Sequence, residues 1–339
     1  MNILVTGGTG FIGSHVCVKL LELGHKVVVI DNLSNSYYSS VENIAKILKI
    51  NLSNNQNLLF FKGDIRNKEP LKKIFSTCSI DLVVHLAGLK SVKESVENPK
   101  KYFSNNVIGS MNLFAVMKKF NCKAIIFSSS ATVYNHNNEM PVGEQDDILP
   151  SNPYGTNKQN IEDTLIDFYN LDNSWHIAIL RFFNPIGAHK SGLIGENPLD
   201  KPNNLMPYIL KVASGELKQL SIFGSDYDTP DGTGVRDYIH IEDLASGHIK
   251  ALVEIIKKPQ LIIANLGTGI GYSVLDVVRT FEKVTKKNIN FQVTRRRAGD
   301  ISMSFSDPSF AKRALNWEAK FSLDEMCKDA WNYKSKNIL

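Results

Sequence analysis

The sequence is poor in the residues that build metal centres and disulfide frameworks. Its 339 residues include only four cysteines, Cys17, Cys78, Cys122 and Cys327, and no two of them form a CxxC pair. The eight histidines also lack the close spacing of metal ligands. We therefore expect reduced cysteines, most of them buried as small hydrophobic residues, and no metal site.

Long apolar runs and targeting signals are also missing. No hydrophobic stretch reaches the ~18 residues that a membrane-spanning helix requires. Residues 1–7 run directly into a strand and a glycine turn, without the charged start and cleavage site of a signal peptide. The sequence predicts a cytoplasmic protein with no membrane partner.

Charge of one sign does not gather in large blocks. The net charge is +5, yet most lysines are spread along the chain, and only Arg295-Arg296-Arg297 forms a tight basic cluster. Three arginines suit a small phosphate ligand better than a nucleic-acid duplex, so we expect no nucleic-acid partner. The composition, 43% hydrophobic and 22% charged, is that of an ordinary globular protein.

Strand and helix patterns alternate through the first half of the chain. Short runs rich in β-branched residues predict strands at 2–6, 26–30, 58–62, 81–86, 124–128 and 176–181. Helical periodicity predicts helices at 11–23, 69–77, 100–120 and 154–169. This alternation favours an α/β fold with a Rossmann-type, doubly wound parallel sheet.

A chain of this length favours two domains, because single cores stop growing near ~250–300 residues. After Asn184-Pro185 the pattern changes to longer loops rich in glycine, proline and asparagine. We expect a Rossmann domain over 1–184 and a smaller C-terminal α/β domain over 185–339. Residues 262–266 again have the pattern of a buried strand, which leaves open that segments within 235–266 return to the first domain.

Glycines cluster between the first predicted strand and the first predicted helix, in the run Gly7-Gly8-Thr9-Gly10-Phe11-Ile12-Gly13. Glycines at this place permit a tight turn, close approach of the backbone to a pyrophosphate, and close packing of the helix on the strand. The helix N-terminus then offers N–H groups to the anion. This context predicts a dinucleotide-binding site.

Acidic residues follow the next two predicted strands. Asp31 lies about twenty residues beyond the glycines, where a carboxylate accepts hydrogen bonds from the adenosine ribose. It would repel a 2′-phosphate, and no arginine follows nearby, so NAD is favoured over NADP. Asp64 is placed either to meet the adenine edge or to cap a helix, and the sequence leaves both interpretations open.

Ser130, Tyr154 and Lys158 are the candidate catalytic residues. Tyr154 and Lys158 are spaced i, i+4, so a helix presents both on one face, and Ser130 follows the end of the strand predicted at 124–128. A phenol with a pKa near ~10 is a poor base at neutral pH, but the Lys158 ammonium and a positive nicotinamide would lower that pKa. Taken singly, the three residues could equally be a strand-end hydroxyl, a packing aromatic and a solvated charge.

Together these three residues form the arrangement of the short-chain dehydrogenase/reductase superfamily, and the chain resembles its extended branch. The resemblance narrows to the UDP-glucose 4-epimerase family and covers nearly the whole chain. The matching stretches are 7–15, 31–33, 63–66, 85–90, 127–134, 181–188, 202–208 and 231–240.

The resemblance implies the binding residues. NAD would contact the glycine turn, the ends of the first strands and the catalytic residues: Gly7, Gly10, Phe11, Ile12, Gly13, Asp31, Asn32, Leu33, Ser34, Asn35, Ser36, Asp64, Ile65, Leu86, Ala87, Gly88, Leu89, Lys90, Asn105, Ser130, Tyr154, Lys158 and Phe183. The UDP-sugar would contact Ser130, Tyr154, Asn184, Asn204, Leu205, Arg236, Arg297, Asp300 and Ser304.

Among the substrate residues, Arg236 and Arg297 can neutralise a pyrophosphate through forked hydrogen bonds. Without the resemblance, Arg236 could equally be the structural ion-pair partner of a nearby aspartate. His85 and His240 are interpreted as core or strand-end histidines.

The resemblance also implies the reaction and the partners. In such an enzyme hydride leaves C4 of a UDP-hexose, the 4-keto sugar turns, and hydride returns to the opposite face. Ser304 stands where a bulky tyrosine of the family restricts the pocket, so we expect activity on UDP-N-acetylglucosamine and UDP-N-acetylgalactosamine as well as UDP-glucose and UDP-galactose. A homodimer through helices of the first domain is implied in the same way.

The chain departs from the family pattern at two positions, and three rival functions share much of that pattern. Asn135 replaces a usual glycine and Asn157 replaces a usual small hydroxyl residue, and neither change removes a reacting group. A 4,6-dehydratase is disfavoured because Ala131-Thr132 stand where related dehydratases place Asp-Glu. The second and third rivals are a UDP-glucuronate decarboxylase and a catalytically silent NAD-binding protein.

Overall fold

A seven-stranded parallel sheet forms the centre of the computed structural model, which describes residues 1–53, 56–199, 202, 204–297 and 300–337. Its strand order is β10-β6-β5-β4-β1-β2-β3. The bounds are β1 Asn2–Thr6, β2 Lys26–Asp31, β3 Leu58–Lys62, β4 Leu82–His85, β5 Ala124–Ser128, β6 His176–Phe182 and β10 Gln260–Leu266.

The aliphatic strand residues are buried on both faces of this sheet. Along β1, Ile3 and Val5 enter one hydrophobic cluster and Leu4 enters another, as expected when successive side chains alternate across a strand. A parallel sheet covered on both faces is the doubly wound arrangement. The fold class predicted from the sequence is therefore confirmed.

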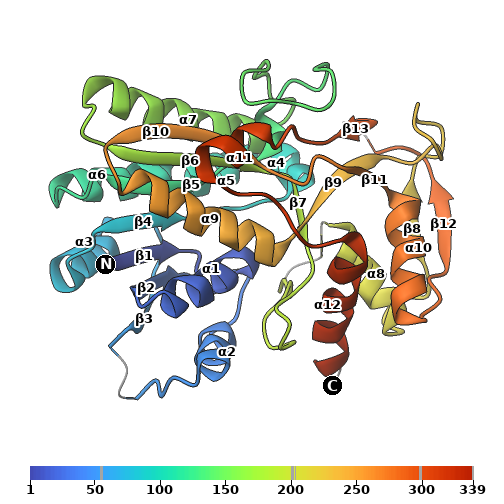
Figure 1. Ribbon diagram of the computed structural model, residues 1–339, viewed down its shortest axis with the longest axis horizontal. Helices are drawn as coiled ribbons and strands as arrows, with labels where there is room; N and C mark the ends of the chain where they lie inside the picture. Colours follow the sequence, from blue (N-terminus) through green and yellow to red (C-terminus); the bar gives the residue numbers. More distant parts are fainter. Residues whose placement is uncertain (54–55, 200–201, 203, 298–299, 338–339) are drawn as a thin grey trace.

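Helices cover each face of the sheet (Figure 1). The first face packs against α1 Phe11–Glu22, α2 Ser39–Leu48, α9 Ile241–Ile255 and α11 Ser309–Leu315. The second packs against α3 Lys68–Cys78, α6 Gly109–Lys119 and α7 Pro153–Leu171.

Three helical features differ from the sequence-based expectation. The helix expected over 100–120 is divided into α5 Pro99–Tyr102, the π-helical η1 Phe103–Ile108 and α6. Neither α2 nor α4 Val92–Glu97 is predicted from the sequence. The short 3₁₀ turn η2 Ala131–Val133 follows β5.

The chain returns to the large sheet late in the sequence. After β9 Val235–His240, helix α9 packs beside α1, and β10 then pairs in parallel with β6 from Gln260↔His176 to Leu266↔Phe182. The edge strand β10 of the large sheet therefore comes from residues that follow β9 in the chain.

The second lobe lies beyond the carboxyl ends of the large sheet's strands and surrounds a core of its own (Figure 1). Strand β9 pairs with β7 Asn184–Ile186, β11 Gly271–Ser273 and β13 Met303–Ser304, while β8 Leu220–Phe223 pairs with β12 Phe291–Thr294. The helices are α8 Leu205–Ala213, α10 Val274–Thr285 and α12 Leu323–Lys336.

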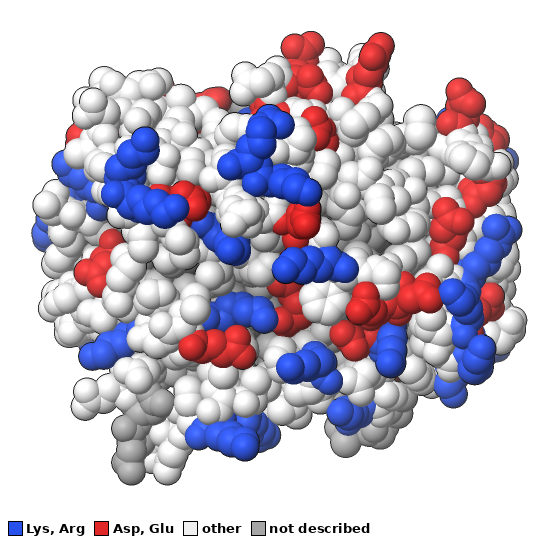
Figure 2. Space-filling model, viewed as in Figure 1, with Lys and Arg blue, Asp and Glu red and all other residues white. Residues whose placement is uncertain are grey.

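The part of the chain that the structure describes lacks the features of a membrane span and of a metal site. There, no helix has the length and apolar character needed to cross a membrane, and no three His, Cys, Asp or Glu side chains gather as metal ligands. Cys17, Cys122 and Cys327 are buried, and all four cysteines are free thiols. On the face drawn in Figure 2, acidic and basic side chains are interspersed.

Candidate active site

The glycine turn between β1 and α1 is shaped to admit an anion. Gly10 caps α1 without a side chain, so the first N–H groups of the helix have no side-chain partner among the described residues. At Gly13 an added Cβ would lie 2.2 Å from the Gly7 carbonyl oxygen, which excludes any larger residue. This backbone cradle, at the positive end of a helix, fits a pyrophosphate.

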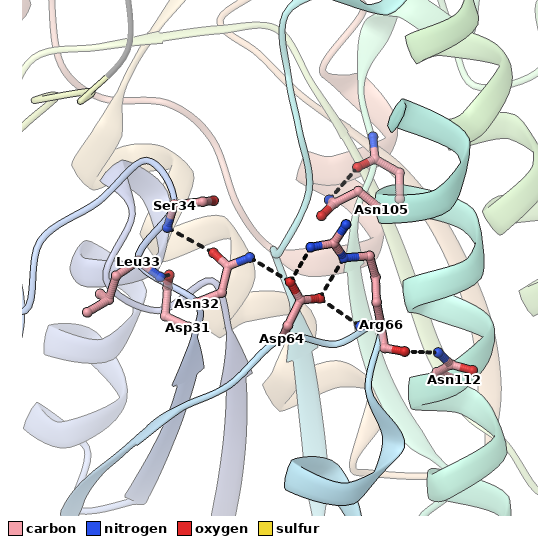
Figure 3. A network of polar contacts seen from close by, with 9 residues as sticks. Asp31, Asn32, Leu33, Ser34, Asp64, Arg66, Asn105 and Asn112 are labelled. Carbon is pink, nitrogen blue, oxygen red and sulfur yellow. Dashed lines mark hydrogen bonds and ion pairs between the residues drawn. The ribbon is translucent and has the colours of Figure 1, made fainter. Parts of the chain in front are cut away.

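Asp31, the last residue of β2, organises the loop that follows it. Its Oδ1 accepts hydrogen bonds from the Leu33 N–H (2.9 Å) and the Ser36 hydroxyl (3.2 Å), and its Oδ2 accepts one from the Thr9 N–H (3.2 Å). The loop over 31–36 is thereby joined to the glycine turn, and Figure 3 shows Asp31 to Ser34 together at the strand ends. With only this bond to the described residues, Oδ2 can still accept a ribose hydroxyl.

Asp64 is held by hydrogen bonds from Arg66 and Asn32. The Arg66 guanidinium donates to both carboxylate oxygens of Asp64, from Nε to Oδ1 at 2.9 Å and from Nη2 to Oδ2 at 2.7 Å (Figure 3). The Arg66 main-chain N–H also donates to Oδ1, and the Asn32 side-chain amide donates to Oδ2. The hydrogen bonds from Arg66 lower the pKa of Asp64 to about 2. These four bonds fill the carboxylate's capacity, and the cap of α3 is Asn67. A contact between this carboxylate and an adenine amino group would require one bond to break.

The segment from Leu86 to Lys90 leaves β4 and is held by the π-helical turn. The Asn106 side chain accepts from the Leu89 N–H (2.8 Å) and donates to the Leu89 carbonyl (2.9 Å). The Asn105 amide in turn donates to the side-chain oxygen of Asn106 at 2.9 Å. The main chain of this segment is therefore fixed beside the glycine turn, whose strand residue Thr6 accepts from the Ala87 N–H.

The structure brings the three predicted catalytic residues together. Tyr154 is the second residue of α7, whose cap Asn152 accepts a hydrogen bond from the Gly155 N–H at 2.9 Å. Ser130 lies two residues beyond the end of β5. The Ser130 hydroxyl is close enough to Tyr154 to lower the pKa of the phenol through a hydrogen bond, although burial has the larger effect. Lys158 lies on the same helix face, with Nζ 5.8 Å from the Tyr154 ring centroid, and all three side chains are buried.

The charges in this cluster differ from the expectation. Burial raises the pKa of Tyr154 to about 12, opposed by the hydrogen bond with Ser130, and burial lowers the pKa of Lys158 to about 8, opposed by Glu162. The Lys158 ammonium donates to the Ser128 carbonyl oxygen at 2.6 Å. The polypeptide by itself therefore does not lower the pKa of Tyr154, because desolvation outweighs the hydrogen bond with Ser130.

A buried ion pair lies one turn beyond the candidate catalytic residue Lys158 and is not predicted from the sequence. Glu162, one turn after Lys158 on α7, accepts from Arg181 on β6 (Nη2 to Oε2 2.6 Å, Nε to Oε2 3.1 Å) and from the Ser129 hydroxyl. Arg181 also donates to the Tyr134 hydroxyl at 3.1 Å. Because Ser129 adjoins Ser130, this network joins the two segments that carry the candidate catalytic residues. The i, i+4 spacing of Lys158 and Glu162 is the sequence feature from which Glu162 could have been predicted.

In the second lobe, Arg236 on β9 forms no ion pair with an aspartate among the residues that the structure describes. Its guanidinium donates to main-chain carbonyls, from Nη1 to Val235 (2.8 Å) and from Nη2 to Ile301 (2.9 Å). The register of the small sheet places Ser304 of β13 opposite Arg236. The structural interpretation of Arg236 as an ion-pair partner is therefore wrong.

Arg297 lies between an acid and an aromatic ring. Its Nε donates to the Asp300 carboxylate at 2.8 Å, and its guanidinium carbon lies 4.8 Å from the centroid of the Phe223 ring. Phe223 is 38% exposed, unusually open for a phenylalanine, and is not predicted as a site residue. It ends β8 next to a surface pocket of ≈ 390 Å³ lined by Gly224, Ser225, Asp226, Thr294, Arg295 and Arg296.

Comparison with known proteins identifies the family. Residues 4–330 match the family model described as GDP-mannose 4,6 dehydratase. The chain is 49% identical over 338 residues to the UDP-glucose 4-epimerase of Bacillus subtilis (strain 168), covering 100% of this chain and 98% of that protein. It is 51% identical to that of Pasteurella multocida (strain Pm70), covering 99% and 98%. The chain belongs to the UDP-glucose 4-epimerase family.

Solved structures of this epimerase family share the fold. The UDP-glucose 4-epimerase of Bifidobacterium longum in complex with NAD+ and UDP is 45% identical, with a TM-score of 0.95 over 99% of each chain. The UDP-Glc/GlcNAc 4-epimerase of Campylobacter jejuni is 33% identical, with a TM-score of 0.83 over 99% of each chain.

Contacts between the two lobes join predicted cofactor and substrate residues of this epimerase family member. Lys90 from the first lobe and Asn204 from the second both donate to Oε1 of Glu196, at 2.7 and 3.0 Å. Asn204 directly precedes Leu205, the first residue of α8, and Asn184 begins β7. Phe183, between β6 and β7, is buried against Tyr134. Asn203, in the matching stretch 202–208, lies outside the described residues.

Proposed function

We propose that this chain interconverts UDP-glucose and UDP-galactose by epimerisation at C4, with NAD as its cofactor. The observation that carries the proposal is the buried cluster of Ser130, Tyr154 and Lys158, together with a glycine turn that can take a pyrophosphate at the end of another strand of the same sheet. The names of the relatives support the same reaction.

The residues around the glycine turn fit NAD. The cradle formed by Gly7 to Gly13 would take the pyrophosphate, Asp31 would accept ribose hydroxyls, and the fixed segment from Leu86 to Lys90 would lie along the nicotinamide half. When bound, NAD supplies the acceptor and donor of the C4 hydride and a positively charged ring next to the phenol.

Tyr154 is proposed to exchange a proton with the C4 hydroxyl. Its pKa of about 12 in the polypeptide alone must fall for it to act near neutral pH, and positive charge beside it, including that of Lys158, stabilises the phenolate. Ser130, which lowers the pKa of the phenol, would hold the same sugar oxygen.

The second lobe is proposed to hold UDP. Arg236 and Arg297 are the diphosphate partners, with Asn184, Asn204, Leu205 and Asp300 as further contacts. Arg297 is available because its present partner is a neighbouring carboxylate at a half-exposed position, and the exposed Phe223 ring is suited to stack on a base. Anchoring through remote groups leaves the hexose free to turn between the two hydride transfers.

The test is turnover of UDP-galactose followed by NMR of the product sugar. The wild-type chain should reach an equilibrium mixture with UDP-glucose, and Tyr154→Phe should lower kcat by about 10²–10⁴-fold, the usual contribution of general acid–base catalysis. Tyr169→Phe, on the same helix, is the matched control and should be unaffected. Full activity in Tyr154→Phe would contradict the mechanism.

Different products would establish one of the rival functions. Release of CO₂ from UDP-glucuronate would establish a decarboxylase, and loss of water from the hexose would establish a dehydratase. No turnover with any UDP-hexose, by protein that retains NAD, would establish the silent NAD-binding protein.

We also propose activity on UDP-N-acetylglucosamine and UDP-N-acetylgalactosamine. Ser304 is small and stands opposite Arg236 in the register of β13 and β9, next to a proposed phosphate partner. Ser304→Tyr should abolish turnover of the N-acetylated pair and keep that of UDP-glucose, while Ser304→Ala should keep both. Unchanged N-acetyl turnover in Ser304→Tyr, measured by the same NMR assay, would refute the role of position 304.

A homodimer and a division of labour between the lobes complete the proposal. Residues 1–184 together with 241–266 would bind NAD, and most of 185–339 would bind the UDP-sugar.

The proposed homodimer would form through α4, η1 and the start of α7. The apolar side chains Val92, Val96, Phe103 and Ile108 of α4 and η1 are exposed there.

A further inference from the structure

Tyr227 lies in the turn between β8 and β9 and is not among the residues predicted to bind a ligand. Its N–H donates to the Gly232 carbonyl at 3.0 Å, and its own carbonyl accepts from the Thr229 N–H at 2.9 Å. The residue is only 6% exposed, although it stands on a connection between strands. A buried phenol in such a turn needs a physical reason.

The ring of Tyr227 is held in one position by its neighbours. Gly224 has a φ of 86°, and a Cβ there would lie 2.5 Å from Cε2 of the tyrosine, so the ring occupies the space that any other residue would fill. The Arg296 guanidinium lies 4.1 Å from the ring centroid and is itself fixed by a 2.7 Å bond from Nε to Asp226. The direction of the hydroxyl is therefore set before any ligand arrives.

The hydroxyl of Tyr227 is buried and makes no hydrogen bond within the described part of the chain. Leaving a buried hydroxyl without a partner costs free energy, and buried polar atoms of this kind are rare in folded proteins. The charged groups that act on it are Asp300, Arg296, Arg236 and Arg297. The hydroxyl is thus within electrostatic reach of the arginines proposed to take the diphosphate.

Of these groups, none already satisfies the phenol. Arginine side chains carry donors only, so they cannot accept from it, and Asp300 is engaged by Arg297 through Nε and Nη2. Burial raises the pKa of Tyr227, which keeps the hydroxyl protonated and therefore a donor. An anionic oxygen held by the arginines would supply the missing acceptor.

We propose that the Tyr227 hydroxyl donates a hydrogen bond to a diphosphate oxygen of UDP held by Arg236 and Arg297. This inference rests on the proposed function and adds a binding residue to it. A neutral phenol between two cations contributes a directed hydrogen bond without adding charge, so it favours a diphosphate in one position.

The experiment measures UDP binding by calorimetry in wild type, Tyr227→Phe and the control Tyr333→Phe, a tyrosine of α12 in the same lobe. Tyr227→Phe should raise the Kd for UDP and the KM for UDP-galactose about tenfold, as expected for a hydrogen bond to a charged group. Its kcat and its content of bound NAD should be unchanged. Without UDP its Tm should match or exceed that of wild type, because no hydrogen bond is lost.

Uridine distinguishes the diphosphate from the rest of the ligand. The weaker binding of Tyr227→Phe should be seen with UDP and be absent with uridine, and an equal loss with both would overturn the assignment to the diphosphate. An unchanged Kd for UDP, or a lower kcat at unchanged Kd, would overturn the inference as a whole. If wild type itself did not bind UDP, the proposed function would fail instead.

Discussion

Lys158 is the residue at which catalysis and stability conflict. It is buried in the catalytic cluster, its ammonium has one carbonyl partner at 2.6 Å, and burial lowers its pKa to about 8. The folded state therefore holds the proton more weakly than the unfolded chain, where the pKa is near 10.5. The cost of burying this charge is fully present below pH 8 and fades as the pH rises to about 10.5.

We predict that Lys158→Met inactivates the enzyme and stabilises its fold. At pH 7 the free energy of unfolding should rise by at most on the order of 3 kcal/mol, because the substitution removes a desolvated charge, and the gain should disappear near pH 10. Thermal unfolding at both pH values measures this, with Lys73→Met, an exposed lysine of α3, as control. A lower Tm for Lys158→Met at pH 7 would show that its hydrogen bond outweighs the burial cost.

At the residue scale the sequence predicts which groups converge but not their partners. Ser130, Tyr154 and Lys158 meet as expected, because a strand end and a helix start fix their positions. The pairing of Asp64 with Arg66, the carbonyl partners of Arg236 and the raised pKa of Tyr154 depend on side-chain packing and desolvation, which spacing along the chain does not reveal.

At the scale of elements, a buried ion pair fixes helix α7 against β6. Glu162 and Arg181 are 2% and 4% exposed. Glu162 also accepts a hydrogen bond from the hydroxyl of Ser129, which adjoins the candidate catalytic residue Ser130. Removing one partner of such a pair leaves an uncompensated buried charge, whereas removing both does not.

We predict that Arg181→Met lowers the free energy of unfolding by about 3–5 kcal/mol, and that the double variant Glu162→Leu/Arg181→Met recovers much of the loss. Urea unfolding measures both. Glu69→Gln, which breaks the exposed pair with Lys72, is the control and should leave the free energy of unfolding nearly unchanged. If the double variant were no more stable than Arg181→Met, the destabilisation would not come from an uncompensated buried charge.

The helix predicted over 100–120 illustrates why element boundaries escape the sequence. The π-helical turn in its middle forms where the Asn106 side chain binds the Leu89 main chain and the Ser110 hydroxyl donates to the Asn106 carbonyl at 2.5 Å. One widened turn barely disturbs a pattern of 3.6 residues. The partner of Asn106 is Leu89, which follows β4 and lies 17 residues earlier in the chain, so the contact cannot be read from the local sequence.

At the scale of the whole molecule, an apolar surface remains uncovered in the single chain. Val96 is 62% exposed on α4, and Ser95 beside it accepts from the Tyr154 N–H at 3.2 Å, so this surface adjoins the catalytic helix. Exposed apolar residues that gather on adjoining helices commonly mark a contact with another protein chain. A second copy is the proposed occupant.

We predict that Val96→Glu shifts the protein from dimer to monomer, because an interface would have to bury the new charge. Light scattering gives the mass in solution. Leu171→Glu is the control: Leu171 is 84% exposed but lies at the opposite end of α7, roughly 25 Å away at 1.5 Å per residue. Equal dissociation by both substitutions, or a monomeric wild type, would refute this interface.

The order in which the chain visits its two lobes limits how such a protein can be recombined. Strand β6 leads into β7, β9 leads into α9, and β10 leads into β11, so the polypeptide passes between the lobes repeatedly. A chimaera that exchanges residues 185–339 with those of a relative would import β10 together with the sugar-binding loops, placing a foreign edge strand against β6. Transplanting sugar preference therefore requires exchanging separate loops, with α9 and β10 left in place.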